Sequence, residues 1–221
     1  SIIAVRNNRR RKVENKIKKK LQGKVYDQVL VIKGSQLSLD FMGYLRQEFS
    51  SAEFILYQWD AIVRVPNYEY MAEMFDTLFS SERLDCLAGS QMTFRPLFAI
   101  PNNFAKKIEK KYDINFIGHL HSKRLMIAKS FETSRLTDPL TGFLYFYTGP
   151  RRWLKELSSP YSKYIHCRPI SYEKVMEINR QSSVILDMPH EHQFGLSFRI
   201  IEAIAQGQKI ITSNADIRNY N

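Results

Sequence analysis

The chain has 221 residues, of which 44% are hydrophobic, 13% aromatic and 25% charged, values that exclude a disordered or fibrous protein. The length allows one large domain or two modest ones, and no apolar run approaches the roughly 18 residues of a membrane-spanning helix. The net charge of +11 is uneven: residues 1–24 hold ten Lys and Arg against Glu14 alone, which gives +9 and leaves +2 for the remainder.

The basic N-terminal segment predicts a helix over residues 9–21, because Val13, Ile17 and Leu21 recur at i, i+4 and i+8. We expect this apolar stripe to pack on the sheet of the first half, with the cations in solvent. The alternative is an arm for nucleic acid or an anionic membrane. The stripe favours the first interpretation, so we expect no nucleic-acid partner. Peripheral contact with the inner membrane face through residues 6–24 is the secondary role that the charge allows.

The first half alternates between strand and helix patterns. Buried-strand patterns cover residues 26–32, 53–57, 77–79 and 94–98, and helix patterns cover residues 39–49, capped by Ser38, and 68–74. This alternation predicts a mostly parallel sheet that is covered on both faces.

A polar joint at residues 101–112 separates this half from a second alternating series. Strands are predicted at residues 114–117, 143–147, 164–167, 183–187 and 209–212, and helices from about residue 123, at 172–179 after Ser171, and at 196–206. We therefore expect an α/β protein of two Rossmann-like domains, residues 1–100 and 113–221, that face a cleft. Because the chain opens on a helix and stops just after a strand, both domains are expected to be incomplete at their outer ends.

The most informative segment runs from Gly195 to Glu202, at the junction between a strand and a helix. Glycine lets the backbone approach a ligand, and the first turn of a helix offers unpaired N–H groups to a phosphate. Arg199 and Glu202 lie at i and i+3 on one helix face, where Arg suits a diphosphate and a carboxylate suits the hydroxyls of a ribose. Spacing alone favours a simpler interpretation, a surface Arg–Glu pair on an amphipathic helix.

The run Gly195-x-x-x-Arg199-x-x-Glu202-Ala203, with Gly207 and the strand at 209–214, resembles the donor-site helix of GT-B glycosyltransferases. The likeness is greatest to spore-maturation-type (CgeB-like) enzymes and to those of bacterial lipopolysaccharide or capsule synthesis. Residues 26–34, 54–60, 116–118 and 183–187 fit the same group. The resemblance implies that the second half binds a nucleotide-sugar donor, the first half a glycan or lipid-linked acceptor, and that the product belongs to a bacterial surface polysaccharide.

Carried over by position, the resemblance implies that Glu202 binds the donor ribose, and that Gly195, Leu196 and Arg199 hold its diphosphate. It implies further donor contacts in two loops and just before the motif: Gly118, His119, Lys123 and Arg124; Arg168, Pro169 and Ile170; His192 and Gln193. Phe194 stands where the E-x7-E pattern of related enzymes has its first acid, so retaining stereochemistry is not implied.

Asp60 is the candidate general base, since it follows a strand of the first half at the end where α/β sheets bind ligands. A carboxylate there would take the proton of the acceptor hydroxyl as that hydroxyl attacks the anomeric carbon. Aspartate is also a common loop residue and helix cap, and that ordinary role is the alternative.

No metal cofactor is expected. The cysteines, Cys86 and Cys167, are far apart, which also favours a reduced, cytoplasmic protein, and no Asp-x-Asp is present. Four histidines are candidate zinc ligands, but their spacing matches no zinc pattern: His119, His166, His190 and His192. The pair His190 and His192 is more simply explained as lining the donor pocket.

Two other function classes stay open. A different α/β nucleotide-binding enzyme would fit the fold, although no Gly-x-Gly-x-x-Gly, Walker or usable Tyr-x-x-x-Lys motif occurs. A nucleic-acid-binding protein rests on the basic helix alone, where no aromatic side chains are interleaved with the cations.

Overall fold

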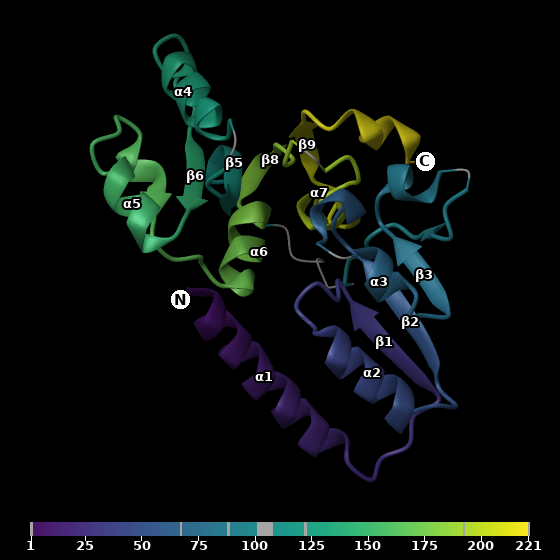
Figure 1. Cartoon of the computed structure of the whole chain (residues 1–221). Helices are drawn as coiled ribbons and strands as arrows, with labels where there is room; N and C mark the ends of the chain where they lie inside the picture. The colour runs from purple at the N-terminus through teal and green to yellow at the C-terminus, as the bar shows by residue number, and fades with distance from the viewer. Residues whose placement is uncertain are drawn as a thin grey trace. The chain divides into compact units, whose positions relative to one another are not determined.

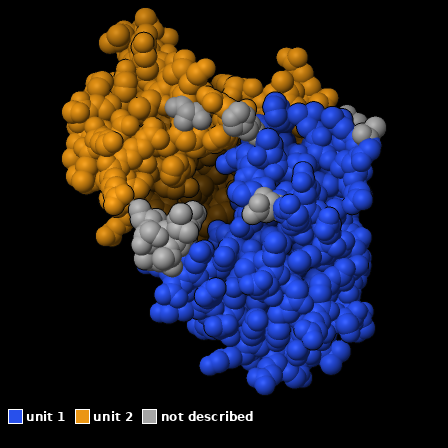
Figure 2. Space-filling view, in the orientation of Figure 1, with its two compact units in different colours: residues 1–96, 192–195 blue, residues 97–191, 196–221 orange. Residues whose placement is uncertain are grey.

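The computed structural model describes residues 2–66, 68–87, 89–100, 108–121, 123–191 and 193–220, with side chains from residue 7 onward. By their contacts, residues 1–96 with 192–195 form one compact unit, and residues 97–191 with 196–221 form another (Figure 2). Each unit is built around its own parallel sheet with helices, which confirms the predicted α/β class with two Rossmann-like parts. The cleft between them stays a prediction.

Unit 1 is built on a parallel four-stranded sheet in the order β1-β2-β3-β4. Its strands are β1 (Gln28–Ile32), β2 (Glu53–Gln58), β3 (Thr77–Ser80) and β4 (Thr93–Phe94), and its helices are α1 (Ile2–Leu21), α2 (Leu39–Glu48), α3 (Tyr68–Ala72) and the 3-10 turns η1 (Ile62–Arg64) and η2 (Arg83–Cys86). The strand expected at 94–98 ends four residues early, because Pro96 has no N–H to donate to a ladder.

The core of unit 1 lies between α2 and the sheet. Ser38 caps α2 as predicted, since its hydroxyl accepts the N–H of Phe41 at 3.1 Å. Behind the cap, Met42 of α2 and Phe54 and Leu56 of β2 are all fully buried. Burying a side chain of this size contributes about 1.5–3 kcal/mol, so this contact fixes α2 on the sheet.

The basic helix α1 packs only through its second half. Ile17 and Leu21 lie against the core of unit 1, as predicted, and the buried carboxylate of Glu14 accepts the N–H of Ser38 at 2.8 Å. The prediction for Val13 is wrong: it is 58% exposed, like its neighbours in residues 7–13, because the helix meets the core only from Glu14 onward. Among the described residues, no helix has the length and apolar character of a membrane span. Membrane contact through residues 6–24 stays a prediction.

Unit 2 has a parallel five-stranded sheet in the order β7-β6-β5-β8-β9. Its strands are β5 (Tyr112–His119), β6 (Gly142–Tyr147), β7 (Ile165–His166), β8 (Ser182–Asp187) and β9 (Lys209–Thr212), and its helices are α4 (Leu125–Ser134), α5 (Pro150–Glu156), α6 (Tyr172–Arg180), α7 (Phe198–Ala205) and the 3-10 turns η3 (Ser162–Tyr164) and η4 (Ala215–Asn219).

The strand order of unit 2 places its first strand, β5, in the middle of the sheet. The chain continues outward through β6 to β7, then returns to the other side of β5 for β8 and β9 (Figure 1). In Figure 1, α6 lies against β5 and β8, α7 lies against β8 and β9, and α5 lies at the other side of the sheet, where it contacts β7. Such a reversal opens a crevice at the carboxyl ends of the two central strands, where α/β sheets bind ligands.

Several predicted boundaries in unit 2 need correction. The joint assigned to residues 101–112 lies partly outside the described residues, at 101–107, and its last residue, Tyr112, already begins β5. The helix expected from Leu196 begins at Phe198, after Ser197 as N-cap. The short helix α5 was not predicted, although Pro150 at its first position is a typical start signal.

Candidate functional site

The candidate site lies at the carboxyl edge of the sheet of unit 2, between β5 and β8. There Gly118 and His119 end β5, and Asp187 ends β8. Parallel neighbouring strands bring these ends to the same edge, which is why residues about 70 positions apart in the sequence share one site.

Asp187 connects three elements beneath this edge. Its side chain is fully buried, and one carboxylate oxygen accepts hydrogen bonds from Nη1 of Arg199 at 2.6 Å and from the hydroxyl of Ser197 at 2.9 Å. The other oxygen accepts the hydroxyl of Thr212 of β9 at 2.9 Å. Because a buried carboxylate is costly unless it is paired and hydrogen-bonded, this arrangement ties β8, α7 and β9 together.

Two arginines lie near this one carboxylate: the partly buried Arg199 is paired with it directly, and the buried Arg124 interacts with it only through its charge. Nη2 of Arg199 donates to the carbonyl of Ile117 at 2.6 Å, and Arg124 donates to the carbonyls of Met188 and His119 at 2.7–3.0 Å. Burial, reinforced by the charge of Arg199, lowers the pKa of Arg124 to about 10, which leaves it charged at neutral pH. Two cations against one carboxylate leave a net positive charge under the edge, which favours an anionic ligand.

Both guanidinium groups lie over the ring of Phe116, at 4.9 Å for Arg199 and 5.3 Å for Arg124. They also explain the glycine at position 118. A Cβ there would lie 3.0 Å from Nη2 of Arg199 and 3.2 Å from Nη1 of Arg124. The small residue therefore makes room for the arginine pair, and the phosphate contact expected of Gly118 stays a prediction.

Three imidazoles gather above the arginines. The ring of His121 lies 4.8 Å from that of His190 and 6.1 Å from that of His119, and His119 lies edge-on to Tyr147 at 5.3 Å. Burial, together with the charges of Arg124 and Arg152, lowers the pKa of His119. His121 was not predicted as a site residue. The one signal for this cluster in the sequence is that His119 and His121 stand at the end of β5 and His190 stands just after β8, two strands that are neighbours in the sheet. Nowhere in the described part of the chain do three His, Cys, Asp or Glu side chains meet as metal ligands.

Glu202 of α7 lies half-buried beside the start of α6. Its carboxylate accepts the hydroxyl of Tyr172 at 2.9 Å. Burial raises the pKa of Glu202, against the hydrogen bond from Tyr172 and the charge of Arg199, which lower it. The loop at 168–171 leads directly into Tyr172, and the carbonyl of Arg168 accepts the hydroxyl of Tyr145 at 3.0 Å. The structure thus brings the residue assigned to the ribose close to the loop assigned to the base.

The segment before α7 is arranged differently from what the resemblance implies. Residues 192–195 group with unit 1, where the carboxylate of Glu82 accepts the N–H of Phe194 at 2.9 Å and that of Gly195. A Cβ on Gly195 would lie 2.5 Å from the carbonyl oxygen of Ser81, so a tight backbone contact requires this glycine. The N–H that was expected to hold a diphosphate is here used by a carboxylate, since both anions suit the same donor.

The remaining predicted donor residues are dispersed. Leu196 is buried, at 2% exposure, and Lys123 is exposed. Arg168 and Pro169 lie exposed in the loop before α6, with Ile170 and Gln193 partly buried, and His192 lies outside the described residues.

Asp60 lies at the carboxyl edge of the sheet of unit 1, after β2. Its carboxylate is 2.6 Å from Nζ of Lys33, which follows β1, and 4.0 Å from Nη1 of Arg64. Lys33 adopts a left-handed backbone conformation, with φ of 66°. The same edge holds Asp85, which accepts the hydroxyl of Ser80 at 2.7 Å and whose pKa is raised by burial. The catalytic role of Asp60 stays a prediction.

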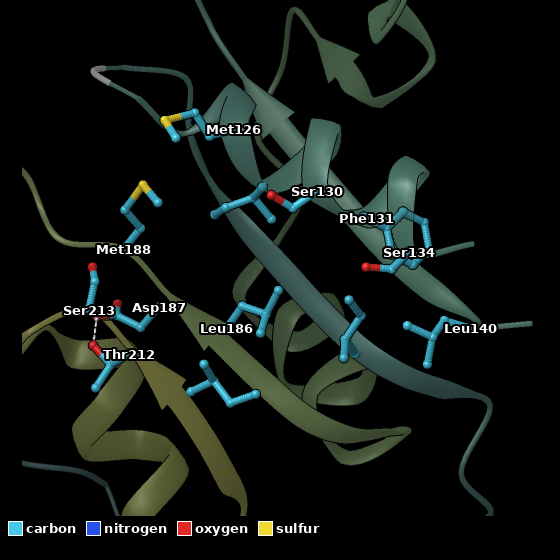
Figure 3. A pocket seen from close by; sticks show the side chains of 13 residues that line it. Met126, Ser130, Phe131, Ser134, Leu140, Leu186, Asp187, Met188, Thr212 and Ser213 are labelled. Carbon is cyan, nitrogen blue, oxygen red and sulfur yellow. Dashed lines mark hydrogen bonds between the residues drawn. The ribbon is translucent and has the colours of Figure 1, made fainter. Parts of the chain in front are cut away.

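A cavity of about 400 Å³ in unit 2 was not predicted (Figure 3). One wall carries Met126, Ser130 and Ser134, spaced at i, i+4 and i+8 on α4, and the facing wall comes from β8, β9 and the residues after them. The lining is mostly apolar and includes Asp187. The full set is Ile114, Met126, Ile127, Ser130, Phe131, Ser134, Leu140, Leu186, Asp187, Met188, Ile211, Thr212 and Ser213.

Comparisons with known proteins show a likeness of fold to solved structures only. No family model matches the chain, and no curated protein matches it. Among solved structures, the chain is similar to the DNA-modifying enzyme β-glucosyltransferase, studied with and without uridine diphosphoglucose. The two share 16% identity at a TM-score of 0.42, over 85% of this chain and 61% of that enzyme. The chain therefore spans less than two thirds of that enzyme, and the likeness carries no argument about activity.

Proposed function

We propose that the chain belongs to a glycosyltransferase that uses a nucleotide-sugar donor. The observation that carries the proposal is the pair of arginines beneath the carboxyl edge of unit 2: Arg199 is paired with the single carboxylate of Asp187, and the buried Arg124 beside it donates its hydrogen bonds to carbonyl oxygens. A fixed excess of positive charge at the topological switch of a parallel sheet suits a diphosphate.

The surroundings of the arginine pair supply the other half of a nucleotide site. Glu202 presents a half-buried carboxylate, which suits the two hydroxyls of a ribose, and the loop at 168–170 adjoins it through Tyr172. A nucleoside diphosphate whose ribose met Glu202 would use one element for each of its parts: the loop for the base, α7 for the ribose, and the β5 and β8 ends for the phosphates.

The main requirement of glycosyl transfer on the donor side is stabilisation of the leaving diphosphate. In glycosyl transfer the bond between the anomeric carbon and a diphosphate oxygen breaks, the acceptor oxygen forms the new bond, and the diphosphate leaves with additional negative charge. Cations held in place before the reaction stabilise that charge without reorganising. Asp60 is the proposed group that takes the proton of the acceptor hydroxyl, and no metal ion enters the proposal.

The sequence resemblance extends the proposal to the acceptor. We infer a glycan or a lipid-linked glycan of a bacterial surface polysaccharide, such as lipopolysaccharide or capsule. A radiolabelled donor distinguishes a lipid-linked acceptor from a free glycan. Label transferred to a lipid-linked acceptor partitions into organic solvent, whereas label transferred to an oligosaccharide stays in water. Label in neither fraction would remove this acceptor class.

A panel of ligands tests the function. UDP, GDP, CMP and ADP sugars, with NAD as a representative of other α/β nucleotide-binding enzymes, are added to the protein while its thermal unfolding is followed. A ligand at 100 times its dissociation constant adds about 2.7 kcal/mol of stability. We expect one sugar nucleotide to stabilise the protein and NAD to have no effect. Stabilisation by NAD alone would favour the other class of enzyme.

Replacing Glu202 with glutamine is expected to weaken binding of the preferred donor by about tenfold to a hundredfold. The change keeps the side-chain volume but removes the charged acceptor of the ribose hydrogen bonds, and the expected loss is roughly 1.5–3 kcal/mol in total. Calorimetric titration measures the affinity. Glu177→Gln, which neutralises a carboxylate paired with Lys174 on α6, is the matched control and should bind as the wild type does. Equal affinity in all three proteins would remove Glu202 from the site.

A further inference from the structure

The three imidazoles of unit 2 come from two loops that meet at one edge. His119 and His121 belong to the end of β5 and the loop after it, and His190 belongs to the loop after β8. The ring centroids of His119 and His121 lie 6.1 Å apart, those of His121 and His190 lie 4.8 Å apart, and all three side chains are at least partly exposed. They therefore form a continuous imidazole surface, the histidine row, that a ligand at the switch point would meet.

The groups around the histidine row are mostly cationic. Arg124 and, from α5, Arg152 flank the β5 side: Arg124 donates to the carbonyl of His119 at 2.9 Å, and Arg152 donates to the carbonyl of Leu120 at 3.0 Å. Beneath lie Arg199 of α7 and the carboxylate of Asp187, both of whose oxygens already accept hydrogen bonds. Among the described residues of unit 2, Tyr147 of β6 lies against His119, and the exposed Glu191 follows His190 in the chain.

This setting opposes protonation of His119 while no anion is bound. A further positive charge would be added beside Arg124 and Arg152, and the pKa of His119 is lowered for this reason as well as by burial. A bound anion reverses the balance, because negative charge within about 4–6 Å stabilises the imidazolium form and gives it an acceptor for its N–H.

We propose that His119, His121 and His190 form a proton-linked clamp for a diphosphate group, which takes protons from solvent when the diphosphate binds and returns them when it leaves. Each imidazolium formed donates its N–H to a phosphate oxygen. The position of the diphosphate rests on the proposed function, but the proton linkage rests on the histidine row and its cationic surroundings. It makes the row a device that strengthens binding of the leaving group as pH falls.

The sign follows from the linkage between protonation and binding. Binding raises the histidine pKa values, so the gain in affinity is complete below the pKa of the free protein and is lost as pH rises through the pKa of the complex. Affinity for the diphosphate should therefore fall with rising pH across the range in which histidine titrates, from about pH 5 to 8.

Calorimetric titration at pH 7 in buffers of different ionisation enthalpy measures the protons taken up. The probes are inorganic pyrophosphate and the nucleoside diphosphate of the preferred donor. We expect uptake on the order of one proton for each diphosphate bound. In His121→Asn and His190→Asn, the uptake should fall and the affinity should drop about tenfold, the loss of one hydrogen bond to a charged group. His166→Asn is the matched control, since His166 stacks on Tyr145 at 3.9 Å in the pair β6–β7 and should leave both values unchanged.

The outcomes separate this inference from the proposed function. Binding of the nucleoside diphosphate without proton uptake, or with the same uptake in both histidine variants, overturns the clamp and leaves the transferase proposal intact. Proton uptake with pyrophosphate but no preference for any nucleotide supports the clamp and counts against the transferase. Absence of binding by both probes overturns both.

Discussion

Replacing Asp187 with alanine is expected to destabilise unit 2 by about 3–5 kcal/mol, the largest effect on stability that the structure indicates. The carboxylate is fully buried and accepts hydrogen bonds from Arg199, Ser197 and Thr212. Its removal leaves the Arg199 guanidinium, whose side chain is only 18% exposed, without its counter-charge. Urea denaturation of the variant and the wild type measures the difference in free energy of unfolding.

Two further variants show whether the stranded cation causes this loss. Thr212→Val removes one hydrogen bond to Asp187 and should cost only about 1 kcal/mol. Asp187→Ala combined with Arg199→Met should recover part of the stability, because the unpaired charge is gone and an apolar side chain takes its place. The single variants Asp187→Ala and Arg199→Met are measured beside the double variant. A loss of stability in the double variant equal to the sum of the losses in these two would contradict the explanation.

Local sequence signals were sufficient for most of the fold. The apolar runs at β1, β2, β5 and β8 are long enough and well enough bounded to identify buried parallel strands. Ser38 and Ser171 each precede a helical pattern, and both accept an N–H from the first turn, as a capping residue does. Alternation of these elements is sufficient to predict the α/β class.

What the sequence could not provide are contacts between distant residues. The phosphate contact expected of Gly118 stays a prediction, and its second role, making room for Arg124 and Arg199, could not be predicted because no local sequence pattern reports those contacts. Glu82 occupies the N–H of Gly195 across 113 positions of the chain. Val13 fits the apolar stripe of α1 but lies on the part of the helix that extends beyond the core. Periodicity predicts which face of a helix is apolar, but not how far along the helix the contact with the core extends.

Replacing Asp60 with asparagine is expected to lower kcat of glycosyl transfer by about a hundredfold to ten-thousandfold, the range of general base catalysis. The amide has nearly the volume of the carboxylate but cannot take the proton of the acceptor hydroxyl. Loss of the ion pair with Lys33 should cost stability by no more than about 1 kcal/mol, since both side chains are one third or more exposed, at 34% and 46%. A folded variant is therefore expected.

The measurement is release of nucleoside diphosphate at saturating donor, with donor affinity determined separately by calorimetry. Donor affinity should be unchanged in Asp60→Asn, because the residues proposed to bind the donor belong to unit 2. Asp76→Asn is the matched control: Asp76 also forms an ion pair, with Arg46 at 2.7 Å, but it precedes β3 and so lies at the opposite edge of the same sheet. Its turnover should equal that of the wild type. If Asp60→Asn turns over at the wild-type rate as well, the proton goes to another group, and Asp60 serves unit 1 only as the partner of Lys33.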